Sequence, residues 1–495
     1  MLNPPDMADE SQKTIRVLFI AAEADPLVKI GGLGDYAGSL PGAILRIAKP
    51  EKKNIDIRVA LPFHKKIEEF AKNPGKILDV TVPTNHGHAS GMVYEYSHEG
   101  IIYYLIKRAG NPDGYADVYN SSQIADARKY IFFSLSALEM LKHINWKTDI
   151  LHANDWHTAL AVYQLSNLRK KDQIFKQIKS LLVIHNVPFL GEGSQKIMRD
   201  FLIPPASSPH LPEWAEYLPL TLGLQSADQL VTVSPSYAKE LKTEEFGDGL
   251  ADFFIANKEK LTGILNGIDY RTWNPDDDPY IFSRFTPSSL DRRIENKYDL
   301  LSSVGLENRM DFPLIVMVSR LTHQKGIDII LRSLHELKDI EWTAIFLGSG
   351  DESYERDLKN LEGIMSKRLR VFLSYNASFA HTLYAGGDMF LMPSLYEPCG
   401  ISQMIAMRYA CIPVANAVGG LKDTITHAPQ ENKTGYLFDG RVEDAFGKCM
   451  VEAFSDFSDK NKWKDIQQRA MIRDFSWNHS AREYIRLYYR LLTNG

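Results

Sequence analysis

The strongest constraint on the fold is an alternation of short apolar runs with longer amphipathic stretches. In the first half of the chain, the apolar and β-branched runs are residues 15–22, 55–62, 150–153, 180–184 and 230–233. A second series follows at residues 314–318, 343–347, 369–373, 389–392 and 412–415. Such runs are typical of buried strands, and the stretches between them have helical spacing. The sequence therefore predicts two doubly wound α/β domains in succession, each built on a parallel sheet.

The length of 495 residues agrees with two domains, because one hydrophobic core rarely grows so large. The boundary is expected within residues 273–287, which contain an acidic, proline-rich and helix-breaking stretch. The expected segments are a polar extension at 1–14, a first domain at 15–275 with an inserted β-hairpin at 80–107, and a second domain at 276–475.

Charge and cysteine content exclude several classes of protein. A net charge of -5 and a pI near 6.3 provide no obvious surface for nucleic acid. Three cysteines, Cys399, Cys411 and Cys449, are too few and too scattered for a disulfide framework or a zinc site. The first 14 residues lack the apolar region of a signal peptide, and no apolar stretch is long enough to span a membrane. We therefore expect a cytoplasmic protein with no nucleic-acid or membrane partner.

A glycine-rich turn follows the first predicted strand, with the sequence Lys29-Ile30-Gly31-Gly32-Leu33-Gly34-Asp35. A dinucleotide-binding dehydrogenase is disfavoured, because position 37 is Ala37 and the second strand ends without a carboxylate for a ribose. Lys29 suits a phosphate or sugar oxygen, although a surface lysine beside a tight turn remains an alternative. Gly419-Gly420-Leu421 repeats the pattern in the second half, and two such helix starts would offer N–H groups to an anion.

A polar and aromatic cluster follows the predicted strand at 150–153. It contains His152, Asp155, Trp156 and His157, and the pair His185-Asn186 ends the next strand. Side chains at the carboxyl edge of a parallel sheet are placed to bind a ligand, and this set suits a sugar. The spacing does not match a helical zinc motif. The alternative is a capping aspartate with structural histidines.

The second half carries the charged groups that suit a nucleotide. Arg320 ends a strand and Lys325 follows it, so the two could clamp a diphosphate, or could belong to a solvated face. Glu397, after the strand at 389–392, could accept the hydroxyls of a ribose, with Ser402 and nearby N–H groups facing phosphate. Alternatively, Glu397 is a carboxylate stabilised by a helix N-terminus. No Asp-x-Asp pair follows a sheet strand, so no metal is expected.

Taken in order, these segments resemble the glycogen and starch synthase family of glycosyltransferases. The resemblance runs from Val17 to about Leu491. Its motifs are the turn at 29–35, Asp155-Trp156-His157, the segments 233–238 and 264–269, Ser319-Arg320-Leu321, Gln324-Lys325-Gly326, Glu397-Pro398-Cys399-Gly400 and Phe475-Ser476-Trp477.

The resemblance implies a GT-B fold, with two Rossmann-like domains facing across a cleft and a last helix at 476–495 that crosses back to the first domain. It also implies a retaining transfer of glucose from ADP-glucose, or UDP-glucose, to a glucan or malto-oligosaccharide, without cofactor or metal. His157 and Asn266 would then lie by the glucosyl unit, Arg320 and Lys325 by the diphosphate, and Glu397 by the ribose. The further donor-binding residues would be Lys29, Gly32, Asp35, Ser402, Gly419 and Gly420.

The departures from the family pattern concern the acceptor. The family usually continues its His-Asn pair with Leu-Ala-Tyr-Gln-Gly, whereas His185-Asn186 is followed by Val187-Pro188-Phe189-Leu190-Gly191. An expected Lys-Gly-Gly appears as Thr221-Leu222-Gly223, and Ile30 replaces a common threonine. Two alternatives therefore stay open: a transferase of the same fold with a small acceptor, and a nucleotide-sugar-binding regulator without catalysis.

Overall fold

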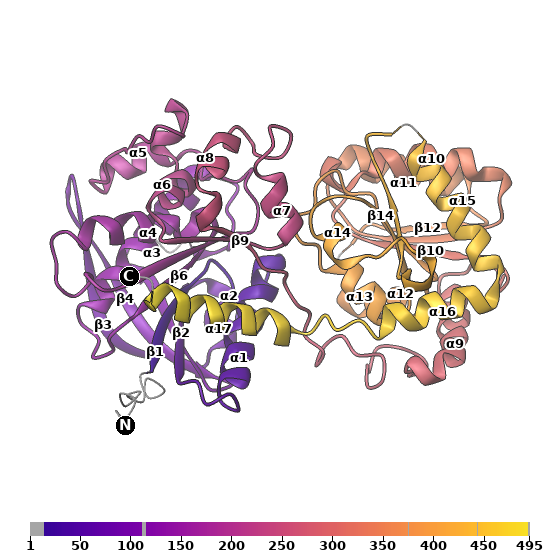
Figure 1. The fold of residues 1–495 in the computed structure, drawn as a ribbon, viewed down its shortest axis with the longest axis horizontal. Helices are drawn as coiled ribbons and strands as arrows, with labels where there is room; N and C mark the ends of the chain where they lie inside the picture. Colours follow the sequence, from indigo (N-terminus) through magenta and orange to yellow (C-terminus); the bar gives the residue numbers. More distant parts are fainter. Residues whose placement is uncertain (1–13, 111–114, 375, 443, 494–495) are drawn as a thin grey trace, which may run out of the picture. The chain divides into compact units, whose positions relative to one another are not determined.

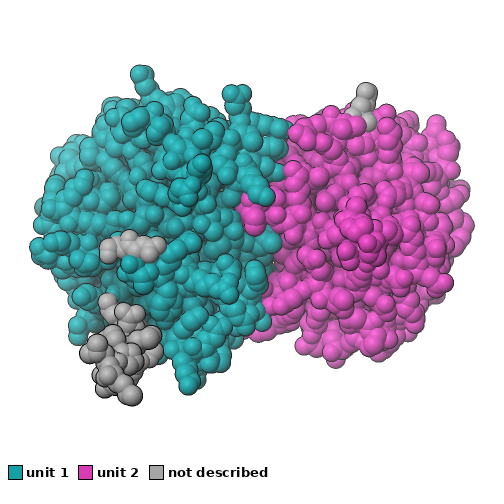
Figure 2. Space-filling model, viewed as in Figure 1, with its two compact units in different colours: residues 1–233, 238–267, 477–495 teal, residues 234–237, 268–476 magenta. Residues whose placement is uncertain are grey.

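The computed structural model describes residues 14–110, 115–374, 376–442 and 444–493, which form two compact units (Figures 1 and 2). The first unit contains the described residues up to Val233, then Ala238–Gly267 and the chain from Trp477 onward. The second contains Ser234–Tyr237 and Ile268–Ser476. The chain passes into the second unit at Ile268, ahead of the segment 273–287 at which the sequence places the boundary.

The sheet of the first unit has the strand order β3-β4-β5-β2-β1-β6-β7-β8-β9. From β5 to β9 all neighbours are parallel, whereas β3, β4 and β5 pair antiparallel. The turn between β4 and β5 contains Glu99 and Gly100, both at positive φ. The strands are β1 Ile15–Ile20, β2 Ile55–Pro62, β3 Gly75–Thr84, β4 Gly87–His98, β5 Ile101–Arg108, β6 Ile150–Asn154, β7 Lys179–Ile184, β8 Gln229–Thr232 and β9 Leu261–Gly263.

The last helix of the chain belongs to the first unit, where Figure 1 shows it in yellow beside α1. The hydroxyl of Tyr36 donates to that of Tyr484 at 2.9 Å, and Nδ1 of His152 lies 2.7 Å from the Tyr488 hydroxyl. All four side chains are buried. The helices that include residues of this unit are α1 Gly32–Ala48, α2 Lys65–Phe70, α3 Gln123–Leu141, α4 Asp155–Leu168, α5 Ser194–Asp200, α6 Pro219–Ser226, α7 Pro235–Glu240, α8 Ala251–Ala256 and α17 Trp477–Thr493.

The sheet of the second unit is parallel throughout, in the order β12-β11-β10-β13-β14-β15. Its strands are β10 Leu314–Val318, β11 Thr343–Leu347, β12 Leu369–Phe372, β13 Met389–Met392, β14 Ile412–Asn416 and β15 Tyr436–Phe438. Its helices are α9 Arg293–Ser303, α10 Ile327–Glu336, α11 Glu352–Ile364, α12 Ala377–Gly386, α13 Ser402–Arg408, α14 Gly419–Thr424, α15 Ala445–Ser458 and α16 Lys460–Met471.

In each sheet the chain builds outward in one direction and then in the other. The reversal lies between β1 and β6 in the first unit and between β10 and β13 in the second. Such switch points leave a crevice at the carboxyl ends of the two strands, where open α/β sheets bind ligands. The topology therefore selects the segments after these four strands as candidate binding segments.

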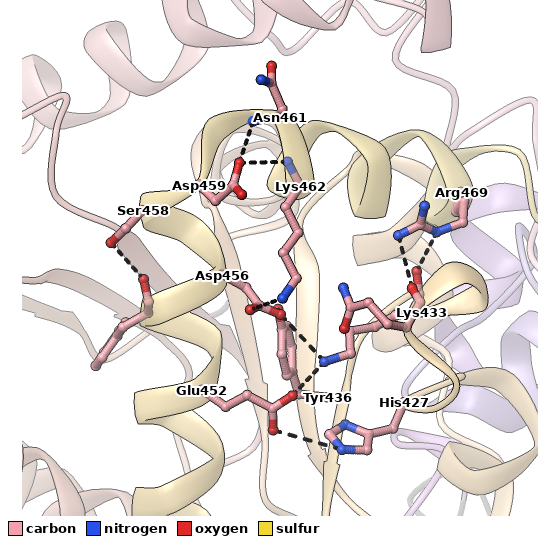
Figure 3. Close-up of polar contacts among 12 residues, drawn as sticks. His427, Lys433, Tyr436, Glu452, Asp456, Ser458, Asp459, Asn461, Lys462 and Arg469 are labelled. Carbon is pink, nitrogen blue, oxygen red and sulfur yellow. Dashed lines mark hydrogen bonds and ion pairs between the residues drawn. The ribbon is translucent and has the colours of Figure 1, made fainter.

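An ion cluster around the buried Lys433 and Asp456 ties α15 and α16 to the segment before β15 (Figure 3). Lys433, which is 3% exposed, pairs with Glu452 at 2.5 Å and with Asp456 at 3.4 Å. Lys462 reaches the other oxygen of Asp456 at 2.6 Å, and the hydroxyl of Tyr436 donates to Asp456 at 2.8 Å. Opposite charges and hydrogen bonds thus satisfy the Asp456 carboxylate, as a buried charge requires.

Candidate active site

The switch point of the second unit holds a cavity of about 150 Å³. Arg320 and Lys325, which follow β10, line it together with Ser394, which follows β13. Ser402, the first residue of α13, lines it as well. The structure thus brings three of the residues predicted from the sequence, Arg320, Lys325 and Ser402, to one cavity. Its two cations make it suitable for an anion.

Glu397 lies against this cavity through an ion pair with one of its lining residues. Nζ of Lys325 is 2.6 Å from Oε2 of Glu397, and the Ser394 hydroxyl donates to the same oxygen at 2.9 Å. The N–H group of Gly420 donates to the backbone oxygen of Glu397 at 3.0 Å, which places the Gly419–Gly420 helix start next to this loop. The sequence predicts separate roles for Lys325 and Glu397, and their direct ion pair is not apparent from it.

The switch point of the first unit begins with the glycine turn after β1. Nζ of Lys29 lies 2.5 Å from Oδ1 of Asp35, and Gly32 is the first residue of α1. Glu23, which is 1% exposed, accepts hydrogen bonds from the N–H groups of Ile30 and Gly31. The candidate residues drawn from the sequence omit Glu23. A carboxylate directly after an apolar strand and shortly before a glycine turn is the signal that could have identified it.

Asp155 connects the neighbouring strands β6 and β7 at their carboxyl ends. Its φ is +52°, and its Oδ1 accepts the N–H group of His185 at 2.7 Å, while the N–H group of Asn186 also bonds to it. Burial raises the pKa of Asp155 to about 7, against the effect of these hydrogen bonds. The segment after β7 is therefore held on the start of α4.

His157 is buried in an aromatic environment in the first turn of the same helix. Its ring centroid is 4.3 Å from that of Trp156, 4.6 Å from Tyr130 and 5.3 Å from Tyr119. Burial holds its pKa well below the usual range, so the imidazole is neutral. Among the described residues, nothing bonds to its buried Nδ1. A neutral ring with an unused nitrogen can hydrogen-bond a sugar hydroxyl.

Two amide side chains of this unit also have a buried polar atom that lacks a hydrogen-bond partner among the described residues. Within the described part of the chain, Oδ1 of Asn266 and Oδ1 of Asn186 are buried without a hydrogen-bond partner. By contrast, Nε2 of His185 lies 3.1 Å from Oδ1 of Asn154, and burial lowers the pKa of His185 to about 3. Unsatisfied buried polar atoms are uncommon in proteins, so Asn266, Asn186 and His157 are groups of this unit that can accommodate a polar ligand.

No group of three metal-ligating side chains occurs among the described residues. None of the described helices is both long and apolar enough to cross a membrane.

Comparison with known proteins identifies the family. The chain is 35% identical to a glycogen synthase of Clostridium botulinum, over 96% of this chain and 99% of that protein. It is 34% identical to the glycogen synthase of Bacillus subtilis, over 97% of this chain and 99% of that one. The chain belongs to the glycogen and starch synthase family. This confirms the resemblance inferred from the motifs, and the protein is a retaining glycosyltransferase.

Within this family the agreement extends to both units and to the fold. Residues 16–256 match the family described as starch synthase catalytic domain, and residues 303–469 match glycosyl transferases group 1. The catalytic domain of starch synthase IV from Arabidopsis thaliana, bound to ADP and acarbose, superposes with a TM-score of 0.86 at 28% identity, covering 97% of this chain and all of that one. Sucrose-phosphate synthase of Thermosynechococcus elongatus, at 17% identity and a TM-score of 0.61 with the same coverage, shares the fold. The GT-B fold is confirmed.

The departing segment 187–191 contacts the start of α6, the helix that carries the departing residues 221–223. The N–H group of Leu220 donates to the backbone oxygen of Leu190 at 3.1 Å. A Cβ on Gly191 would lie 2.8 Å from both Pro219 and Trp156. The altered loop at 187–191 thus packs between the start of α6, which carries the altered residues 221–223, and the neighbour of His157. Phe189 in this loop is 53% exposed.

Proposed function

We propose that the protein extends an α-1,4-glucan with glucose from ADP-glucose. The observation that carries the proposal is the cavity at the β10–β13 switch point, where Arg320 and Lys325 meet Ser402 and the Glu397 loop. In this family member, two cations at one cavity suit the diphosphate of a nucleotide sugar.

In the second unit, the diphosphate bonds to Arg320 and Lys325, and the Ser402 hydroxyl and the Gly419–Gly420 backbone lie near the phosphates. The carboxylate of Glu397 accepts hydrogen bonds from the ribose hydroxyls. Its ion pair with Lys325 holds the ammonium group at the cavity, which Lys325 lines. The Lys325 side chain is only 16% exposed. Neutralising the charge that develops on the departing diphosphate lowers the barrier to transfer without a metal.

In the first unit, Lys29, Gly32 and Asp35 contribute to donor binding. The neutral imidazole of His157 and the free amide oxygen of Asn266 hydrogen-bond the glucosyl unit. Because the pKa of His157 lies well below its usual range, the imidazole acts as a hydrogen-bonding group and carries no charge at neutral pH.

Retention follows from attack on the same face from which the diphosphate leaves. The nearby carboxylates of Asp155 and Glu23 are both held by backbone N–H groups, which disfavours either as a nucleophile. The bond from the glucosyl C1 to the diphosphate oxygen breaks, and the acceptor hydroxyl oxygen bonds to C1. The proton of that hydroxyl passes to the departing diphosphate oxygen, so charge and atoms balance through an oxocarbenium-like transition state.

The test is incubation with labelled ADP-glucose or UDP-glucose and a glycogen primer. We expect an α-1,4-extended polymer, made faster from ADP-glucose. His157→Ala should cut turnover by at least about 100-fold. The control is His143→Ala, which replaces an exposed histidine in the loop after α3 and should leave turnover unchanged. No extension with either donor would refute the polymer function.

A second candidate is glucosylation of a small acceptor by the same donor chemistry. The observation that favours it is the altered loop at 187–191, which packs against Trp156 and exposes Phe189. Product analysis with small polyols and sugar phosphates in place of glycogen separates the two functions.

A further inference from the structure

Glu23 makes hydrogen bonds to two separate segments of the first unit. It lies three residues beyond β1, and its carboxylate accepts the N–H group of Gly31 at 3.2 Å and that of Ile30. The hydroxyl of Tyr119 donates to its Oε1 at 2.9 Å. One buried side chain thus ties the end of β1 both to the glycine turn and to the segment that precedes α3.

Both hydrogen-bonded segments lead directly to residues assigned to the glucosyl donor. Ile30 follows Lys29 in the chain, and a Cβ on Gly34 would lie 3.0 Å from Cγ of Lys29 and 3.1 Å from Oε2 of Glu23. The turn, the lysine and the carboxylate are therefore in close contact. On the other side, the ring centroid of Tyr119 lies 5.3 Å from that of His157.

A carboxylate at this position is unfavourable in itself. Burial raises the pKa of Glu23, and the hydrogen bonds from Ile30, Tyr119 and Gly31 act in the opposite direction. An apolar side chain would avoid the cost of burying a charge, but it could not accept hydrogen bonds. Two carboxylate oxygens can accept from three donors that come from two segments, which fixes those segments relative to each other.

We propose that Glu23 is a positioning residue for glucosyl transfer, holding Lys29 and His157 in their productive arrangement. The inference rests on the proposed function, in which both residues act on the donor. Glu23 acts through the Ile30–Gly31 backbone and through Tyr119. Because a displacement of about 1 Å can lower a rate about 100-fold, loss of these hydrogen bonds affects turnover more strongly than folding.

Two substitutions separate positioning from simple packing. Glu23→Ala leaves three donors unpaired, so we expect kcat to fall about 100-fold with the KM for glucan unchanged. In Glu23→Gln, the amide oxygen can accept both N–H groups while the amide nitrogen donates to the Tyr119 hydroxyl. We therefore expect Glu23→Gln to restore kcat to within about tenfold of wild type.

A matched control is Asp228→Ala, at a second carboxylate of the same unit that is mostly shielded from solvent. Asp228 accepts the N–H group of Ser180 at 2.7 Å and the guanidinium of Arg169. It precedes β8, at the edge of the sheet opposite the switch-point segments. We expect Asp228→Ala to lower the melting temperature and to leave kcat unchanged. A Glu23→Ala variant that behaves in the same way would overturn the proposal.

Hydrogen exchange supplies a readout that does not depend on catalysis. The amides of residues 28–34 should exchange faster in Glu23→Ala than in wild type. In Asp228→Ala their exchange rates should equal those of wild type. Unchanged exchange in Glu23→Ala would overturn the positioning role, whatever the chain catalyses. If exchange is faster in Glu23→Ala but the wild-type protein transfers no glucose, the positioning role stands and the proposed function fails.

Discussion

The ammonium group of Lys325 lies 2.6 Å from the carboxylate of Glu397, although 72 positions separate them in the sequence. They meet because β10 and β13 are neighbours at the reversal of the sheet, so the loops that follow these strands share one edge. The pair therefore couples the residue proposed for the diphosphate to the residue proposed for the ribose. Removing either partner deprives the other of this ion pair and lets its side chain move.

Glu397→Ala should lower kcat by at least about 100-fold while the protein stays folded. The substitution removes the proposed ribose contact and frees the Lys325 side chain, which is 16% exposed and can be rehydrated. Initial rates with saturating donor and glycogen, together with a melting curve, measure both effects. Glu341→Ala is the control, because Glu341 is exposed and pairs with Arg368 at 3.6 Å. A near-wild-type rate for Glu397→Ala would remove it from the active site.

The strands around these residues could be predicted because apolar runs mark them clearly. Residues 55–62, 314–318, 343–347 and 389–392 coincide with β2, β10, β11 and β13. By contrast, β9 and β15 have three residues each, too few to show a period, and the alternately exposed β3 lacks a continuous apolar run. Local pattern therefore predicts the strands that carry a predominantly apolar run, including the edge strand β12 at Leu369–Phe372, and misses strands that lack one.

The site could be predicted as a set of residues, but its contacts could not. Arg320, Lys325 and Glu397 each follow an apolar strand, which the sequence displays. The Lys325–Glu397 pair depends on which strands are neighbours, and the Glu23–Tyr119 bond joins residues 96 positions apart. Such contacts arise from the order of strands in the sheet, which a single sequence does not state.

Asp155 should make stability fall as pH rises. Its folded pKa of about 7 exceeds the value of about 3.9 for an unfolded aspartate, so between these values the folded chain keeps a proton that the unfolded chain releases. The stabilisation is complete below about pH 4 and is lost as the pH rises through about 7, by up to about 4 kcal/mol.

Asp155→Asn tests this contribution, because the amide oxygen can still accept the N–H group of His185. Urea unfolding of both proteins at pH 5, 6, 7 and 8 gives the difference in unfolding free energy, in which other titrating groups such as Glu23 largely cancel. We expect the unfolding free energy of wild type minus that of Asp155→Asn to fall as the pH increases from 5 to 8. A difference independent of pH would show that Asp155 is ionised throughout.

Gly326→Ala should destabilise the second unit by at least about 2 kcal/mol. The φ of Gly326 is +67°, and a Cβ there would lie 2.2 Å from the backbone oxygen of Pro393. The loop after β10 would have to move away from the loop after β13, which also displaces Lys325. In Gly363→Ala, the new Cβ meets nothing within 4 Å on a helix, so this control should gain up to about 1 kcal/mol. Equal melting temperatures for the two variants would contradict this account.

Lys433→Met should destabilise the second unit by about 1–3 kcal/mol, because it removes one of the two cations that pair with the buried Asp456 carboxylate (Figure 3). Asp456 keeps Lys462 and the Tyr436 hydroxyl as partners, and the Glu452 side chain, which is 43% exposed, can be solvated by water. The control is Lys464→Met on the same helix as Lys462, since Lys464 pairs with Asp291 in solvent and should contribute less than about 1 kcal/mol. Chemical denaturation measures both. If the two lysine substitutions cost the same, the cluster does not hold α15 and α16 against the segment before β15, and packing alone secures them.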